Sequence, residues 1–250
     1  MSGAEAAGPA APRPRVKICG VTRAADARAV AEAGADLVGV ILARGFSRSL
    51  PDARAREVAA AAGLPVVGVF VNAGARDVLE AARAVGLSIA QLHGDESPGT
   101  VREIREAGLA VWKAVRVREA DDVLRARDRF GREVDALLLD GWHPERAGGA
   151  GVRFDWHAVA ELRRSGGLDV PLVAAGGLTP ANVAEVVGVL DPDYVDVSSG
   201  VERSIGRKDP ELVKAFVAAA RGAWVPTAGA EKARAGPGPD ARGPDDTRGS

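Results

Sequence analysis

The sequence predicts a single closed barrel of eight β/α units, in the α/β class, and three observations lead to this prediction. Short runs of β-type residues alternate with helical segments eight times along the chain. Alternation of this kind implies parallel strand pairing, and eight units favour closure into a (β/α)₈ barrel. The length of 250 residues, 46% of them hydrophobic, suits one barrel with a sizeable core.

An open doubly wound sheet is the alternative arrangement for alternating strands and helices. Its usual signature is a Gly-x-Gly-x-x-Gly motif that follows the first strand and opens the first helix. No such motif follows the first expected strand of this sequence. The closed barrel is therefore favoured over the open sheet.

The individual elements follow from hydrophobic periodicity, with short apolar runs as strands and apolar residues spaced three and four apart as helices. Thr22, Ser97 and Thr179 are expected to cap helices, because a hydroxyl can accept a bond from a free amide of the first turn. The expected strands are Val16–Cys19, Leu37–Leu42, Pro65–Val71, Ile89–Leu92, Val111–Val117, Ala136–Asp140, Val170–Ala174 and Tyr194–Val197. The expected helices are Ala24–Ala33, Asp52–Ala62, Arg76–Val85, Pro98–Ala107, Glu119–Phe130, Asp155–Ser165, Pro180–Val189 and Pro210–Arg221.

Both ends of the chain differ in composition from the middle. Residues 1–15 and 224–250 are mostly Gly, Ala, Pro and charged residues, with almost nothing to bury. We expect both to be disordered tails, which leaves residues 16–223 as the barrel and catalytic domain. The first tail lacks a basic segment followed by an apolar one, so it is not expected to be a secretory signal.

Charge and composition argue against several classes of partner. The formal net charge is −1 and aromatic residues make up 4%, so nothing favours binding to nucleic acid or to an acidic membrane surface. Cys19 is the only cysteine, which excludes an internal disulfide and a thiolate zinc cluster. No apolar run approaches the length of a membrane span. A cytoplasmic location is the expectation, with monomer and homodimer both open.

Catalytic groups of a barrel enzyme come from the C-terminal ends of its strands and from the loops that follow. Three of the expected strands end in a titratable group: Cys19 carries a thiol, His93 an imidazole and Asp140 a carboxyl. Taken alone, a buried cysteine is more often a packing residue, and an aspartate at a strand end more often belongs to a turn. Their shared position makes them candidates for acid and base chemistry.

The loops after the last two strands are predicted to bind a phosphate. Gly176 and Gly177 would let backbone amides approach an anion closely. Ser198, Ser199 and Gly200 follow the eighth strand and can open a short extra helix, whose N-terminus points amides at the same anion. Barrels commonly hold a phosphate between these two loops, although tight turns would use the same residues.

A series of motifs extends this pattern along the chain from about Val16 to Arg221. They are Lys17-Ile18-Cys19-Gly20, Gly68-Val69-Phe70-Val71-Asn72, Gln91-Leu92-His93-Gly94-Asp95-Glu96, Ala175-Gly176-Gly177-Leu178-Thr179-Pro180 and Val195-Asp196-Val197-Ser198-Ser199-Gly200-Val201-Glu202. In this order they resemble the motifs of phosphoribosylanthranilate isomerase, an enzyme of tryptophan biosynthesis. The resemblance omits only the two tails.

The resemblance implies an Amadori rearrangement of N-(5-phosphoribosyl)anthranilate into 1-(2-carboxyphenylamino)-1-deoxyribulose 5-phosphate. An acid must protonate the furanose ring oxygen as the C1–O bond opens, and a base must remove the proton from C2. The resemblance assigns Cys19 as the general base and Asp140 as the general acid, with no metal or other cofactor. Desolvation at the apolar barrel mouth would favour a neutral Asp140, and a cation near Cys19 would make the thiol partly thiolate.

Three further residues are candidates for substrate binding. Arg48 matches an arginine that the family places near the anthranilate carboxylate, with an ordinary surface arginine as the alternative. His93 is expected either to line the site or to be structural. Asp196 shares a strand face with Ser198, so we expect it to hydrogen-bond the substrate or to pair with inward-facing Lys17.

The chain departs from the family pattern in two loops. Ala150 stands in Gly148-Gly149-Ala150-Gly151 where the family has threonine, so a hydroxyl is lost, although the loop is still expected to close over the site. Ile205 replaces a proline, which should loosen its loop. Arg203 and Arg207 are expected to add positive charge near the phosphate.

Other barrel proteins remain as alternatives. A pentose-phosphate epimerase would need metal-binding histidines and aspartates at strand ends, and only His93 offers itself. Indole-glycerol-phosphate synthase would need a lysine and a glutamate there; Lys113 lies in the fifth strand, but a thiol–carboxyl pair has no part in that reaction. A barrel that binds phosphate without catalysis would lack Cys19 or Asp140, and both are present.

Overall fold

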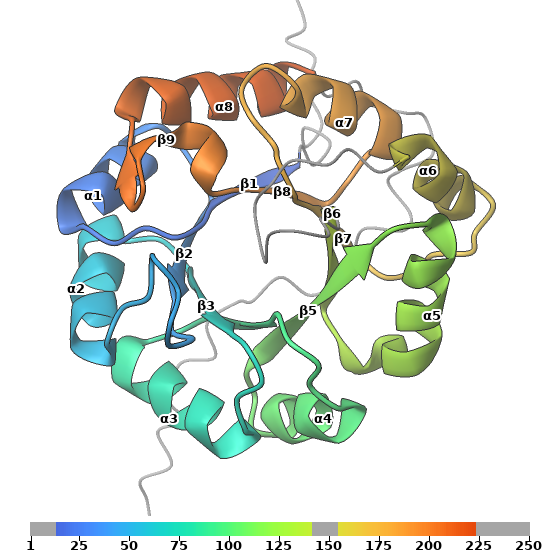
Figure 1. The fold of residues 1–250 in the computed structure, drawn as a ribbon, viewed down its shortest axis with the longest axis horizontal. Helices are drawn as coiled ribbons and strands as arrows, with labels where there is room; N and C mark the ends of the chain where they lie inside the picture. Colours follow the sequence, from blue (N-terminus) through green and yellow to red (C-terminus); the bar gives the residue numbers. More distant parts are fainter. Residues whose placement is uncertain (1–13, 142–154, 224–250) are drawn as a thin grey trace, which may run out of the picture. The chain divides into compact units, whose positions relative to one another are not determined.

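Eight parallel strands form a closed barrel in the computed structural model, which describes residues 14–141 and 155–223. The strands follow one another around the barrel in sequence order, and β1 pairs with β8 to close it. In these ranges a helix follows each strand and lies outside the barrel (Figure 1). The strands are β1 (Arg15–Ile18), β2 (Leu37–Ile41), β3 (Val66–Phe70), β4 (Ile89–Leu92), β5 (Ala110–Val117), β6 (Ala136–Gly141), β7 (Leu172–Ala174) and β8 (Tyr194–Val197). The helices are α1 (Ala24–Glu32), α2 (Asp52–Ala62), α3 (Ala75–Val85), α4 (Pro98–Glu106), α5 (Ala120–Phe130), α6 (Trp156–Arg164), α7 (Val183–Leu190) and α8 (Pro210–Gly222).

The structure confirms the predicted barrel, and one boundary moves at its start. Composition assigns Arg15 to the N-terminal tail, but β1 begins there. The reason is a ladder bond, because the Arg15 amide donates to the carbonyl of Asp193 at 2.9 Å. Residues 1–13 and 224–250, which make up the rest of the predicted tails apart from Pro14, lie outside the described residues.

The predicted helix caps are partly wrong. Ser97 caps α4 as expected, since its Oγ accepts from the amide of Thr100 at 3.1 Å. Thr22 has a different partner: its hydroxyl donates to the carbonyl of Gly206 at 2.6 Å, and α1 starts without a side-chain cap. Thr22 therefore joins the loop after β1 to a loop more than 180 residues away in sequence.

The loop after β7 is longer than the sequence predicts. Proline favours the first turn of a helix, which predicts a start at Pro180. Instead, the side chain of Asn182 accepts a bond from the amide of Thr179 at 2.7 Å and donates to the carbonyl of Gly177 at 3.0 Å. These bonds stabilise a turn, and α7 begins only at Val183.

The segment after β8 contains the expected short helix and an unexpected hairpin. The short helix is a 3₁₀ turn, η2 (Ser199–Val201). The hairpin pairs β9 (Glu202–Ser204) with β10 (Arg207–Lys208) in antiparallel orientation. Ile205 lies in its turn, where it is exposed, so the segment that was expected to be loose has regular structure.

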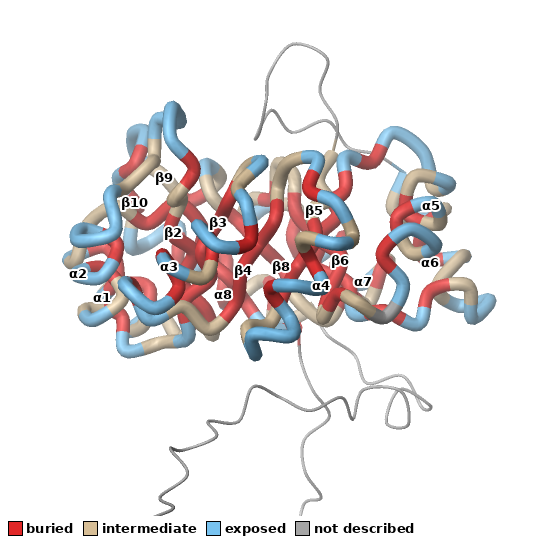
Figure 2. Tube along the Cα trace, turned by 90° about the horizontal axis from the view of Figure 1, so that it is seen from below, coloured by how far each residue is buried: buried red, intermediate tan, exposed pale blue. Residues whose placement is uncertain are grey.

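The two faces of each strand have different surroundings. In β1, Val16 and Ile18 pack in the large apolar cluster beneath the helices, whereas Lys17 between them points into the barrel. Figure 2 shows the strands buried within the ring of helices. Inside the barrel, near the N-terminal ends of the strands, lies a separate apolar cluster. It includes Leu37, Val67, Ile89, Trp112, Leu138 and Val173.

Trp112 is the largest side chain of this inner cluster. It is 2% exposed, and its ring centre lies 4.8 Å from that of Tyr194 on β8. It thus fills the barrel beneath the polar residues described below. None of the helices in the described ranges is long and apolar enough to cross a membrane.

Replacing Trp112 by alanine is expected to lower the free energy of unfolding by about 3–5 kcal/mol, because the indole leaves a cavity that rigid strands cannot fill. The measurement is urea unfolding followed by circular dichroism. Leu212→Ala on α8 is the control, since Leu212 is 37% exposed and should cost much less. Equal losses in the two variants would show that Trp112 does not fill the interior.

Candidate active site

A layer of polar side chains lies inside the barrel next to the apolar cluster. Lys17 of β1, Gln91 of β4 and Asp196 of β8 are each buried by 90% or more, with exposures of 0%, 1% and 8%. The Lys17 ammonium donates to Gln91 Oε1 at 2.9 Å and forms an ion pair with Asp196 Oδ2 at 3.0 Å. Of the two roles expected for Asp196, the pairing with Lys17 is therefore present.

The charge of Lys17 is retained by this pairing. Burial is the largest influence on its pKa and acts to lower it, but the charge of Asp196 and the neighbouring Cys19 outweigh burial and raise the pKa above its ordinary value. Lys17 is therefore an ammonium ion inside an apolar barrel. Oδ1 of Asp196 is buried and has no hydrogen-bond partner among the described residues.

Cys19 lies one step further along the inner face of β1, at its C-terminal end. Cys19 is 6% exposed, and its sulfur shares the space above Gly39 with the Lys17 side chain. Space for the sulfur comes from Gly39 of β2, where an added Cβ would lie 2.9 Å from Cys19 Sγ and 3.0 Å from Lys17 Cε. Gly39 was not predicted from the sequence, although a glycine within a strand often marks such a close approach.

The expectation that a cation makes Cys19 partly thiolate needs correction. Lys17 and Lys208 do act to lower the pKa of the thiol, but burial has the larger effect and Asp196 adds to it. The net result is a pKa above the ordinary value of 9.0. In the ligand-free protein at neutral pH, Cys19 is therefore a thiol.

Asp140 and His93 meet at the same end of the barrel. Asp140 ends the inner face of β6, and His93 follows β4 two residues after Gln91. His93 Nε2 lies 3.3 Å from Asp140 Oδ2, and His93 Nδ1 lies 2.9 Å from Gln91 Nε2. Together with Lys17, these side chains form a hydrogen-bonded row across the barrel. The row connects the neighbourhood of Cys19 to Asp140.

Arg48 lies against Gly20, the residue after Cys19, and is held by a partner that the sequence did not predict. Its Nε donates to Glu202 Oε1 at 2.8 Å, and its Nη2 donates to Glu202 Oε2 at 2.6 Å. Lys208 of β10 lies 2.9 Å from the same carboxylate and donates to the carbonyl of Ser198 at 3.0 Å. Although burial acts to raise the pKa of Glu202, the bonds from Arg48 and Lys208 lower it below its ordinary value.

The two glycine-bearing loops lie against one another. Gly176 and Gly177 have φ of +83° and +69°, which favour glycine over residues with a Cβ. A Cβ on Gly200 would collide with the carbonyl of Leu178 in the loop after β7. Close backbone contact between the loops after β7 and β8 thus requires Gly200, and it brings together the residues of the predicted phosphate site.

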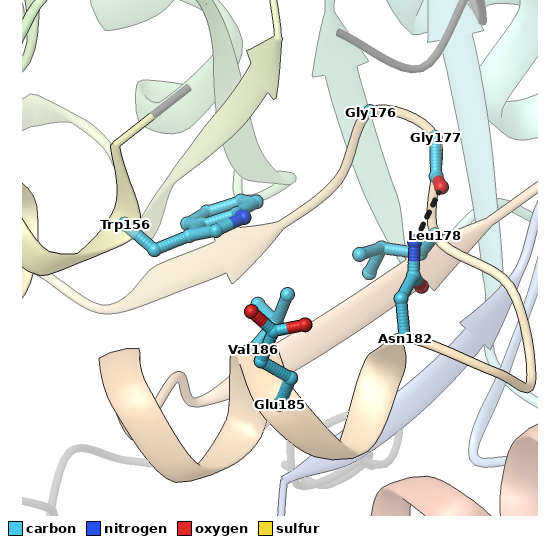
Figure 3. Close-up of a pocket in the computed structure, with 7 residues that line it drawn as sticks. All are labelled: Trp156, Gly176, Gly177, Leu178, Asn182, Glu185 and Val186. Carbon is cyan, nitrogen blue, oxygen red and sulfur yellow. Dashed lines mark hydrogen bonds between the residues drawn. The ribbon is translucent and has the colours of Figure 1, made fainter. Parts of the chain in front are cut away.

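Beside the loop after β7 there is also a small hollow, shown in Figure 3. It is lined by Trp156, Gly176, Gly177, Leu178, Asn182, Glu185 and Val186. These residues come from the start of α6, from the loop and from α7, so the hollow lies between helices rather than in the barrel. It is distinct from the row that leads to Cys19.

Some expected residues fall elsewhere. Gly148, Ala150 and Gly151 lie outside the described residues, so closure of that loop stays a prediction.

Lys113 points away from the barrel interior: its ammonium pairs with Glu96 Oε2 at 3.1 Å and lies 5.7 Å from the ring centre of Phe130 on α5. It therefore does not provide the strand-end lysine of a synthase.

Known proteins of one family match this chain over the whole barrel. The model of the family described as N-(5'phosphoribosyl)anthranilate (PRA) isomerase matches residues 16–219. The N-(5'-phosphoribosyl)anthranilate isomerase of Rubrobacter xylanophilus is 46% identical over 83% of this chain and 98% of its own. The enzyme of that name from Myxococcus xanthus is 48% identical, over 83% of this chain and 96% of its own.

Solved structures agree with the sequence relatives. The phosphoribosyl anthranilate isomerase of Thermotoga maritima superimposes with a TM-score of 0.76 at 39% identity, over 84% of this chain and 99% of its own. A second structure, of such an enzyme in complex with reduced 1-(o-carboxyphenylamino)-1-deoxyribulose 5-phosphate, has a TM-score of 0.73 at 37% identity and covers the same shares. The chain belongs to the N-(5'-phosphoribosyl)anthranilate isomerase family.

Proposed function

We propose that the chain converts N-(5-phosphoribosyl)anthranilate into 1-(2-carboxyphenylamino)-1-deoxyribulose 5-phosphate, with Asp140 as general acid and Cys19 as general base. One observation carries this proposal: both side chains lie at the C-terminal end of the barrel, on the inner face, connected by the row of Lys17, Gln91 and His93. Barrel enzymes carry out their chemistry at this end.

Substrate binding follows from the groups around this row. The phosphate would lie against the backbone amides of Gly176–Gly177 and Ser198–Gly200, where positive φ and the 3₁₀ turn expose amides to an anion. Arg48 uses Nε and Nη2 for Glu202, and Nη1 donates one N–H to Ser47 Oγ at 3.5 Å, so its second N–H would bind the anthranilate carboxylate. The unpartnered Oδ1 of Asp196 would accept a hydrogen bond from a hydroxyl of the sugar.

The chemistry begins with opening of the sugar ring. Asp140 gives its proton to the ring oxygen as the C1–O bond breaks, and the nitrogen lone pair forms the C1=N iminium. Cys19, as the thiolate left when its own proton has passed to solvent, then removes the proton from C2, and the electron pair of the C2–H bond forms the C1=C2 bond of an enolamine. Transfer of the C2 hydroxyl proton and protonation of C1 complete the ketone, so no atom is gained or lost.

The raised pKa of Cys19 gives the substrate a part in activating the base. Burial keeps the resting thiol protonated, but ring opening places a positive iminium next to it. An opposite charge in a buried site stabilises the thiolate. The fraction of Cys19 in the thiolate form is therefore highest once the iminium has formed, which is when a base is needed at C2.

Alternative functions lose support from the geometry. Lys113 faces the helices, which removes the lysine of the synthase alternative. A barrel that only binds phosphate would leave the fluorescence of the anthranilate group unchanged, whereas an isomerase should lower it without added metal or nucleotide. Cytoplasmic location, and the choice between monomer and homodimer, stay predictions. One solved relative from Thermotoga maritima is described as dimeric.

Asp140→Asn should reduce turnover by about 10²–10⁴-fold while the substrate still binds, because the amide has no transferable proton. The measurement is the fall in anthranilate fluorescence, with binding measured separately by quenching at equilibrium. Asp128→Asn on the exposed face of α5 is the matched control and should leave turnover unchanged. Near-normal turnover in Asp140→Asn would refute the acid assignment.

Titration of Cys19 should give an inflection above pH 9.0, since burial raises the pKa of the thiol. The measurement is the ultraviolet absorbance of the thiolate as a difference from Cys19→Ser, which is specific because Cys19 is the only cysteine. The same protein in denaturant should return to the ordinary value. An inflection below 9.0 in the folded protein would contradict the electrostatic account of this site.

A further inference from the structure

The hydrogen bonds of the row have a fixed direction. A lysine ammonium has donors and no acceptor. Because Lys17 lies 2.9 Å from Gln91 Oε1, this oxygen is the acceptor, and the amide of Gln91 has only one possible orientation. Its NH₂ group then faces His93 Nδ1 at 2.9 Å.

The orientation of Gln91 determines which nitrogen of His93 carries the proton. An amide NH₂ donates, so His93 Nδ1 must accept through its lone pair. A neutral imidazole has one N–H, and that hydrogen is then on Nε2. Since Nε2 lies 3.3 Å from Asp140 Oδ2, the N–H donates to Oδ2.

We propose that Lys17 and Gln91 are positioning residues that hold His93 as the neutral Nε2–H tautomer, so that Asp140 carries its transferable proton on Oδ1. This inference rests on the proposed role of Asp140 as the acid. Oδ2 is occupied as an acceptor, whereas Oδ1 lies by the loop after β7, 2.8 Å from where a Cβ of Gly176 would be. That loop forms one side of the predicted phosphate site.

The arrangement meets opposite electrostatic needs at the two ends of the row. A cation near Cys19 favours the thiolate, whereas a cation near Asp140 would favour the carboxylate and remove the acid. Lys17 provides a positive charge only at the Cys19 end of the row. The neutral amide of Gln91 accepts from Lys17 and donates to His93, so it orients His93 without adding a charge. A neutral His93 therefore orients Asp140 without ionising it.

Most charged groups around the row are paired, and the exposed Arg116 of β5 lies in register with Asp140 on the neighbouring strand. Asp196 balances Lys17 at 3.0 Å. Behind β4, Lys113 pairs with Glu96 at 3.1 Å. On the side of Cys19, Arg48 and Lys208 pair with the carboxylate of Glu202 at 2.6 Å and 2.9 Å. Among the described residues, protonation of His93 would place a cation in direct hydrogen-bond contact with Asp140.

The direct test is the tautomer of His93 in the unmodified protein. Nitrogen chemical shifts of ¹⁵N-labelled histidine distinguish Nδ1–H, Nε2–H and imidazolium, and His93→Gln assigns the signal among the three histidines. The expected result at neutral pH is an unprotonated Nδ1 and a protonated Nε2. An Nδ1–H tautomer or an imidazolium would overturn the inference, and this measurement needs no variant to be active.

A negative charge introduced into the row gives a second test. In Gln91→Glu the carboxylate would accept from both Lys17 and His93 Nδ1, which stabilises the imidazolium and so favours ionised Asp140. Turnover should fall by about tenfold or more, with the limb of the pH–rate profile set by Asp140 displaced to lower pH. A purely structural role for Gln91 would leave the position of that limb unchanged.

Rescue by a second substitution separates charge from packing. His93→Gln keeps a neutral donor near Asp140 and cannot become a cation. We expect the double variant Gln91→Glu, His93→Gln to turn over faster than Gln91→Glu alone. A double variant that is slower than the single one would show that charge at His93 is not the cause and would overturn the inference.

Failure of this inference and failure of the proposed function give different results. If Asp140→Asn keeps near-normal turnover, the acid assignment fails whatever the state of His93. If Asp140→Asn is inactive but His93 has the Nδ1–H form, the acid assignment stands and only the role of Lys17 and Gln91 is lost.

Discussion

A lysine ammonium can remain charged inside an apolar barrel only if its charge is balanced and its hydrogen bonds are made, and the rest of the active site depends on how Lys17 meets this condition. Its pair with Asp196 joins the first and last strands at the point where the barrel closes. Removal of one partner from a buried pair typically costs about 3–5 kcal/mol, because the other charge is left unpaired. The pair thus connects barrel closure with the chemistry of the site.

The position of Lys17 has consequences in two directions. Toward Cys19 it provides a charge that opposes the effect of burial on the thiol. Toward Asp140 it fixes Gln91, which in turn makes contact with His93. Space for this arrangement depends on a neighbouring strand, since a Cβ at Gly39 would press on both Cys19 and Lys17. The site is therefore built from the inner faces of several strands rather than from one loop.

Much of this could be predicted from the sequence because the signals are local. Alternation of strands and helices predicts the barrel, and strand ends indicate Cys19, His93 and Asp140 without knowledge of contacts. The gap between Lys17 and Gln91 is 74 residues, so their bond depends on the register of the closed sheet. Strand parity predicted that Lys17 faces inward, but it does not show which residue lies opposite.

The wrong predictions have a common physical origin in side chains that bond distant or local backbone. Thr22 is of a residue type that often caps helices, yet its hydroxyl donates to the carbonyl of Gly206, which is 184 residues away in the sequence. Asn182 stabilises a turn, so that α7 begins at Val183 rather than at Pro180, where the proline favours a helix start. The partner of Arg48 was missed because this contact between two side chains depends on the hairpin after β8, which brings Glu202 to Arg48.

A crystal structure with reduced 1-(o-carboxyphenylamino)-1-deoxyribulose 5-phosphate bound would test the central claim most directly. The account predicts the sulfur of Cys19 and Oδ1 of Asp140 in contact with the sugar carbon chain from opposite sides, with the phosphate on the amides of the loops after β7 and β8. A ligand whose sugar lies away from either side chain, or a Lys17 that turns from Gln91 when the site is filled, would contradict it.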